Sequence, residues 1–177
     1  MNEIRYDHPK KKTNYSLPTI FLAGPTVREH QQHLTSWRVP AVDIFKRKKF
    51  EGNVLIPEFL KKQEKINYKD IIEWERNGLT NSDIIMFWIP RTKELIGLTT
   101  NYELGYWMGR EKEKIVYGHP LSAYKTSYTD VMWIKEWEDS KVPELSCGLK
   151  NVSAPIYNSL EKTVEAAIEK ARRKKCD

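Results

Sequence analysis

The sequence predicts an α/β protein in which helices cover both faces of a mainly parallel sheet. Short apolar runs alternate with longer segments whose apolar residues recur at helical spacing, and such alternation is typical of βαβ units. The most apolar run, Asp83 to Pro90, shows no polar alternation, which indicates a central strand buried on both faces. Together these patterns predict one doubly wound domain with about five strands.

Each expected element follows from its own local pattern. Apolar runs that end near Gly or Pro predict strands at residues 19–24, 54–59, 83–90 and 114–120, with a short strand at 152–155. Helical spacing predicts helices at residues 30–48, 68–79, 127–138 and 159–174, and one that starts near Thr99 or Thr100, which are good cap residues. Pro40 falls inside the first helix, so we expect a kink or a split there.

Length and hydropathy narrow the class of protein. The 177 residues fit one domain, and no apolar run approaches the roughly 20 residues that cross a bilayer. Residues 1–17 are polar and basic, and no secretory pattern follows them. We therefore expect a flexible N-terminal arm over 1–17, a single domain over 18–177 and a cytoplasmic protein.

Cysteine usage and charge disfavour several kinds of site. Cys147 and Cys176 make neither a disulfide framework nor a metal cluster, and the four histidines are scattered, so we expect no metal and no cofactor. The net charge of +6 gathers in short runs at the arm and at expected helix ends, where the helix dipole favours cations. This distribution disfavours a nucleic-acid polymer as partner, whereas a small anionic substrate would benefit from the positive field.

The substrate pocket is expected beyond the carboxyl ends of the strands, where open α/β sheets bind their ligands. Loops at that edge include Gly24-Pro25-Thr26, Pro57-Glu58, residues 89–98 and residues 118–120. The first loop matches neither the dinucleotide fingerprint nor the Walker loop, which disfavours dinucleotide binding and phosphoryl transfer.

Carboxylates are the side chains at this edge that could perform chemistry. Glu103 lies in the first turns of a helix that starts at the edge, within NYELGYW, among apolar groups. Such a carboxylate can attack or stabilise the anomeric carbon of an oxocarbenium-like transition state. Glu58 follows the second strand, Asp83 starts the third at the opposite end, and Glu75 is interpreted as a surface charge on a helix. Trp88, at a strand exit, either stacks against a planar base or fills the core.

Seven segments resemble, in order, the nucleoside 2-deoxyribosyltransferase-like proteins. They lie between Thr19 and Pro120 and read IFLAGPT, SWR, IPE, EWE, SDIIMFWIP, GLTTNYELGYW and VYGHP. The resemblance implies a flavodoxin-like fold that exchanges or hydrolyses bases on deoxyribose. It also implies that Glu103 attacks C1′ to form a glycosyl-enzyme, that Asp83 assists proton transfer or positioning, and that residues 24–26 lie under the substrate. Family members commonly assemble as homo-oligomers, which we expect here by analogy.

Two positions depart from the family pattern. Phe21 stands where family members carry a tyrosine that bonds to the nucleophile, and Gly97 stands where they carry an aspartate. Nearby Thr100 and Asn101 are candidates to hold the sugar hydroxyls instead.

Three functions stay open at this point. The first is a transferase that uses a second base as acceptor. The second is a hydrolase, acting on a nucleoside 5′-monophosphate whose phosphate Arg28 or Arg38 could bind. The third is a nucleotide-binding module without catalysis. The preferred base and the choice between ribose and deoxyribose are not determined by the sequence.

Overall fold

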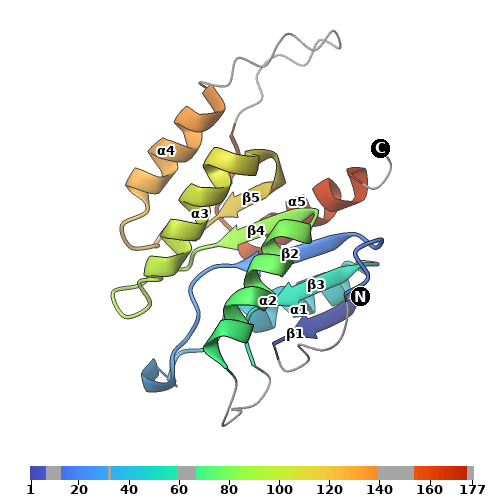
Figure 1. The fold of residues 1–177 in the computed structure, drawn as a ribbon. Coiled ribbons are helices and arrows are strands. Elements are labelled where there is room, and N and C mark those ends of the chain that lie inside the picture. Colours follow the sequence, from blue (N-terminus) through green and yellow to red (C-terminus); the bar gives the residue numbers. More distant parts are fainter. Residues whose placement is uncertain (7–12, 32, 60–66, 139–153, 175–177) are drawn as a thin grey trace, which may run out of the picture.

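A computed structural model of the chain describes residues 1–6, 13–31, 33–59, 67–138 and 154–174. Its centre is an open sheet of six strands in the order β1-β3-β2-β4-β5-β6, and every neighbouring pair is parallel (Figure 1). The strands are β1 (Asn2–Arg5), β2 (Thr19–Ala23), β3 (Asn53–Ile56), β4 (Ile84–Trp88), β5 (Ile115–Gly118) and β6 (Ile156–Tyr157). Without β1, this is the order of a flavodoxin-like sheet, so the predicted fold class is confirmed.

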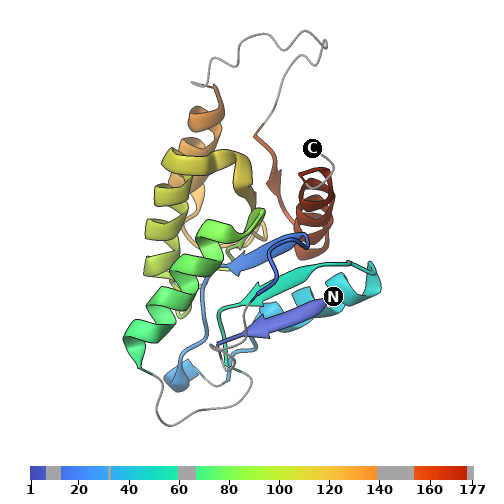
Figure 2. The same ribbon diagram turned by 45° about the vertical axis from the view of Figure 1, so that its right-hand side comes forward.

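Five α-helices cover the two faces of the sheet. They are α1 (Arg38–Arg47), α2 (Tyr68–Asn81), α3 (Leu98–Glu111), α4 (Ser127–Glu138) and α5 (Leu160–Arg173), with short 3-10 turns η1 (Glu29–Gln31) and η2 (Lys112–Lys114). Helices α1 and α5 lie on one face, and α2, α3 and α4 lie on the other (Figures 1 and 2). No helix among the described residues is long and apolar enough to cross a membrane.

The sheet separates two clusters of buried side chains. One cluster, beneath α1 and α5, includes Phe45 and Trp88. The other, beneath α2, α3 and α4, includes Phe21, Trp107 and Trp133. Strands β2 and β4 are buried along their whole length, as their unbroken apolar sequences predict for central parallel strands.

The N-terminal arm is the main correction to the expected elements. Asn2–Arg5 forms β1, an edge strand that pairs with β3, although residues 1–17 were expected to be a flexible arm. An edge strand needs little apolar sequence, and within β1 the one buried side chain is Ile4. Glu3, on this outer strand, forms ion pairs with Arg5 and Lys46, which accounts for the polar composition that suggested an arm.

Three smaller boundaries also differ from expectation. Helix α1 begins at Arg38, so Pro40 lies in its first turn, where its missing N–H breaks no helical bond, and the helix continues without interruption to Arg47. The N-cap of α3 is Gly97, with φ of 65° and no side-chain cap, so the expected threonine caps are wrong. The last strand lies at Ile156–Tyr157 instead of 152–155, of which residues 152 and 153 are outside the described part of the chain.

Gly24 provides a test of how tightly the edge is packed. Its φ is +150°, and a Cβ there would lie 2.3 Å from the carbonyl oxygen of Trp88. We expect Gly24→Ala to lower the free energy of unfolding by roughly 2–4 kcal/mol, measured by chemical denaturation.

Gly105→Ala is the matched control for Gly24→Ala. A Cβ at Gly105, in α3, meets no atom within 4 Å, so this variant should gain about 0.5–1 kcal/mol. A Gly24→Ala protein as stable as the wild type would contradict the close packing described for this edge.

Candidate functional site

The carboxyl ends of the strands bring several separate segments to one edge of the sheet. Because all pairings are parallel, the residues that follow each strand lie at the same edge. They include Tyr6 after β1, the Gly24-Pro25-Thr26 loop after β2, Glu58 after β3, Arg91 after β4 and His119 after β5. This edge also receives α2 and α3, which carry two half-buried carboxylates.

A buried guanidinium organises the loop that follows β2. Arg38, at the start of α1, is 1% exposed, and its donors are directed at protein acceptors. Those acceptors lie 2.8 to 3.2 Å away and are the carbonyl oxygens of Leu22, Gly24 and Pro25, the hydroxyl of Thr26 and the carboxylate of Glu58. Trp37 Nε1 also donates to Pro25 O, at 3.0 Å. The side chains of Trp37 and Arg38 therefore fix the loop that was predicted to lie under the substrate.

The carboxylate of Glu58 completes this arrangement. Its Oε1 lies 2.8 Å from an Arg38 nitrogen, and the hydroxyl of Ser36 lies 2.8 and 2.7 Å from its two oxygens. Both residues were expected to contact substrate, and Arg38 was a candidate for a phosphate. Their polar atoms are directed at one another and at the loop, and they hold the loop that was expected to lie under the substrate.

Two glutamates from different helices influence each other electrostatically beside this loop. Burial raises the pKa of the Glu103 carboxyl to about 7; the charge of Glu75 adds to the rise, and Arg38 opposes it. Burial also raises the pKa of Glu75, against a hydrogen bond from Tyr6 and the positive charges of Arg38 and Arg28. Two carboxyls with raised pKa values at a ligand-binding edge are a typical acid–base arrangement.

Asp83 lies at the other edge of the sheet. It precedes β4, and its Oδ2 accepts a hydrogen bond from the backbone N–H of Thr19 at 2.8 Å, at the amino ends of β2 and β4. This position ties two strand starts together and separates Asp83 from Glu103 by the length of a strand. The carboxylate whose charge raises the pKa of Glu103 is Glu75.

The remaining predicted contacts fall into two groups. Trp88 is 5% exposed and packs in the cluster beneath α1 and α5, on the face opposite α3, so its side chain fills the core. Thr100 is buried near Gly97, whose α-carbon approaches Pro25 so closely that a Cβ would lie 2.8 Å from the proline ring. Thus Thr100 lies beside the loop after β2.

Asn101 is exposed on α3 and accepts a hydrogen bond from Arg91. Arg91 is 5% exposed, and it also donates to Lys125 O at 3.0 Å. Its Nε has no hydrogen-bond partner among the described residues. A buried cation therefore lies next to the second turn of α3, close in sequence to Glu103.

Three residues at this edge were not among the predicted site residues, and they differ in the signal that the sequence offered. Glu75 is four residues from both Ile71 and Leu79, which places it on the apolar side of α2. Arg91 follows the strand whose exit was expected to face the pocket. Tyr6 offered no signal, since it lies in the segment interpreted as an arm.

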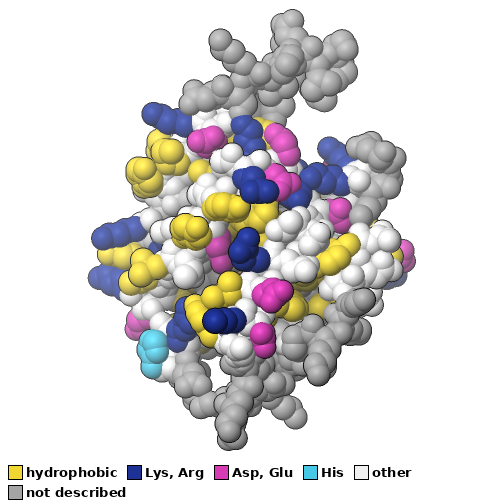
Figure 3. Space-filling view, viewed as in Figure 1, with side chains coloured by type: hydrophobic (Ala, Val, Ile, Leu, Met, Phe, Trp, Pro, Cys, Tyr) yellow, Lys and Arg dark blue, Asp and Glu magenta, His cyan; other side chains and the backbone are white. Residues whose placement is uncertain are grey.

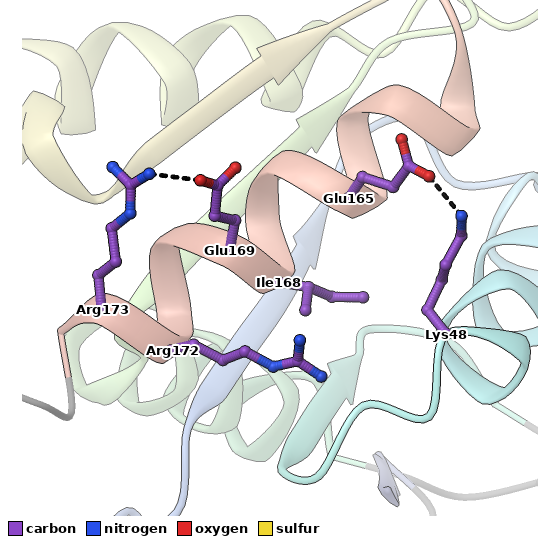
Figure 4. A pocket seen from close by; sticks show the side chains of 6 residues that line it. All are labelled: Lys48, Glu165, Ile168, Glu169, Arg172 and Arg173. Atoms are coloured by element: carbon purple, nitrogen blue, oxygen red, sulfur yellow. Dashed lines mark hydrogen bonds and ion pairs between the residues drawn. The ribbon is translucent and has the colours of Figure 1, made fainter.

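A surface hollow elsewhere offers no comparable chemistry. It lies between the end of α1 and α5 and is lined by Lys48, Glu165, Ile168, Glu169, Arg172 and Arg173 (Figure 4). Lys48 pairs with Glu165, and Arg173 pairs with Glu169. Among the described residues, no group of three or more His, Cys, Asp and Glu side chains could hold a metal ion.

Comparison with known protein families identifies the family of the chain. A family model described as nucleoside 2-deoxyribosyltransferase like matches residues 17–120, which include β2 to β5 and both glutamates. No curated protein gives a significant match. Since the matched segment covers more than half of the 177 residues, the chain belongs to the nucleoside 2-deoxyribosyltransferase-like family.

Proposed function

We propose that this protein cleaves the N-glycosidic bond of a nucleoside or deoxynucleoside and transfers the sugar to a second base, through a glycosyl-enzyme formed on Glu103. The observation that carries the proposal is the raised pKa of Glu103 at the carboxyl-end edge of the sheet, caused first by burial and then by the like charge of Glu75. Family membership supports the reaction class, and the buried setting of both carboxyls supports their use as nucleophile and acid.

The two carboxyls divide the work in the first half-reaction. An oxygen of ionised Glu103 attacks C1′, the bond from C1′ to the base nitrogen breaks, and its electron pair leaves with the base. The base nitrogen takes a proton from Glu75, and Arg38 supplies positive charge that keeps a share of Glu103 ionised.

The second half-reaction reverses these roles. An acceptor base attacks C1′ through its nitrogen, gives its proton to Glu75 and releases Glu103 as a carboxylate. With water as acceptor, the same steps make the protein a hydrolase. Chromatography separates the two, since a transferase releases little free base until an acceptor base is added.

The raised pKa of Glu103 sets the expected pH dependence. The reaction needs Glu103 ionised while Glu75 keeps its proton, whereas the pKa of about 7 for Glu103 includes the charge of an ionised Glu75. The pair therefore loses its last proton near pH 7, and kcat/KM for base exchange should fall as the pH increases through about 7. Glu103→Gln should lose at least about a thousandfold in kcat.

Glu73→Gln is the control, because Glu73 is exposed on the adjacent helix α2. A profile that only rises through pH 7 would contradict the use of Glu75 as the proton donor.

Substitution of Glu75 separates proton donation from nucleophilic attack. Glu75→Gln should lower kcat/KM about a hundredfold for ordinary nucleosides, whose bases need a proton to leave. An N7-methylated purine nucleoside already carries a positive base, so its cleavage should be nearly unchanged.

The same variant removes the charge that raises the pKa of Glu103 and leaves only Glu103 to titrate, so its remaining activity should rise with pH, with a midpoint below about 7. Equal losses on both substrates would show that Glu75 has no role as an acid.

A specific observation favours a second candidate, an N-glycosidase or transferase that acts on nucleoside 5′-monophosphates. No side chain caps the amino end of α3, and the first turn of this helix contains no acidic residue that would repel an anion. The buried guanidinium of Arg91 donates to Asn101 in the next turn. Free backbone N–H groups at a helix start, together with a nearby cation, suit a phosphate.

Arg91→Met tests the phosphate preference. We expect the ratio of kcat/KM for a 5′-monophosphate to kcat/KM for its nucleoside to fall by roughly tenfold or more. Lys125→Met is the control. It removes an exposed positive charge from the residue whose backbone carbonyl accepts a hydrogen bond from Arg91. An unchanged ratio in Arg91→Met would exclude Arg91 from phosphate binding.

The surface supports the expected homo-oligomer as a further part of the proposal. Exposed hydrophobic side chains lie on α3 and α4, toward the left of Figure 3, and include Leu98, Tyr102, Tyr106, Tyr128, Val131 and Ile134. A second copy of the chain would cover them. We place the protein in the cytoplasm, with small nucleosides or nucleotides as its substrates.

A further inference from the structure

Strand β1 brings the N-terminal residues to the site edge. It runs parallel to β3, with Arg5 opposite Ile56, the last residue of β3. The residue after Arg5 therefore emerges at the same edge as Glu58 and the loop after β2. That residue is Tyr6, which lies outside the segment matched by the family, residues 17–120.

Tyr6 is fixed by contacts on its ring and its hydroxyl. It is 7% exposed. Its ring centroid lies 4.7 Å from Trp74 in an edge-to-face arrangement and 5.1 Å from Phe59. Its hydroxyl donates a hydrogen bond to Oε1 of Glu75.

We propose that Tyr6 is a positioning residue of the site, whose hydroxyl holds the carboxylate of Glu75 beside Glu103. Its expected effect on rate depends on the proposed function, whereas its effect on the two carboxyls does not. Tyr6 reaches no substrate atom in this proposal and acts through Glu75 alone.

The charged groups around the pair determine what the hydroxyl does. Glu75 is influenced by Tyr6 after β1, Arg38 on α1 and Arg28 in the loop before η1. Tyr6 is influenced by Glu75, Arg38 and Glu103. Burial, followed by the charge of Glu75, raises the pKa of Tyr6 far above its usual range, so the phenol stays protonated and remains a donor at neutral pH.

Removal of this donor should change both carboxyls in opposite directions. The hydrogen bond from Tyr6 lowers the pKa of Glu75, so its loss raises that pKa. A more protonated Glu75 repels the charge on Glu103 less, and the pKa of Glu103 falls. A purely structural tyrosine would produce neither change.

The test is Tyr6→Phe, which keeps the ring between Trp74 and Phe59 and removes only the oxygen. Carbon-13 NMR titration of the glutamate carboxyl carbons, assigned with Glu75→Gln and Glu103→Gln, should show the Glu75 midpoint rising by roughly half a pH unit or more. The Glu103 midpoint should fall. Unchanged midpoints for both carboxyls would overturn the proposal.

Tyr15→Phe is the matched control. The Tyr15 hydroxyl donates to Asn77 Oδ1 at 3.2 Å, also on α2, so this variant removes a similar bond away from the carboxyl pair. Neither midpoint should move. Glu75→Gln gives a second test that does not require the Tyr6→Phe protein to fold. The Glu103 midpoint should fall at least as far in Glu75→Gln, and a constant midpoint would contradict the electrostatic effect of Glu75 on Glu103.

These measurements separate the two proposals. Shifted midpoints in Tyr6→Phe, with no base release or exchange by the wild type, would reject the proposed function and keep the role of Tyr6.

Discussion

The position of the site depends on the buried guanidinium of Arg38. A charge removed from water is costly unless acceptors surround it, and here backbone carbonyls of the loop after β2 and the carboxylate of Glu58 do so. Their bonds tie α1, β2 and β3 together at the point where three carboxyl-end segments meet. The same charge lowers the pKa of Glu103 and Glu75 against the effect of burial. One side chain thus sets both the shape of the edge and its electrostatics.

The sequence predicted the central part of the fold well and its edges less well. Strands β2 and β4 are continuous apolar runs because both faces are covered, and such runs are easily identified. Strand β1 is covered less, so its composition resembles that of a tail. Likewise, Asp83 and Glu75 lie eight positions apart, both before strand β4. Only the three-dimensional arrangement shows that the charge of Glu75 acts on Glu103. Trp88 lies at the expected strand exit, but its side chain points to the other face.

The position of Phe21 clarifies how this chain departs from its family. The resemblance implies a tyrosine there, and its absence suggested that a hydroxyl near the nucleophile had been lost. In the structure, Phe21 packs 6.0 Å from Trp74, and Tyr6 packs against the same indole. A phenol is therefore present beside the carboxyl pair, although it comes from a strand at the edge of the sheet. This hydroxyl comes from a position that alignment of motifs does not compare, and its partner is Glu75.

The separation of β1 from its partners along the chain has a consequence for biosynthesis. Asn2 pairs opposite Asn53, and Tyr6 bonds to a residue 69 positions later. On the ribosome, these early residues must wait until β3 and α2 have emerged from the exit tunnel before they can dock. This edge of the sheet would then be completed late, after the central strands have paired, by a segment translated before any of them.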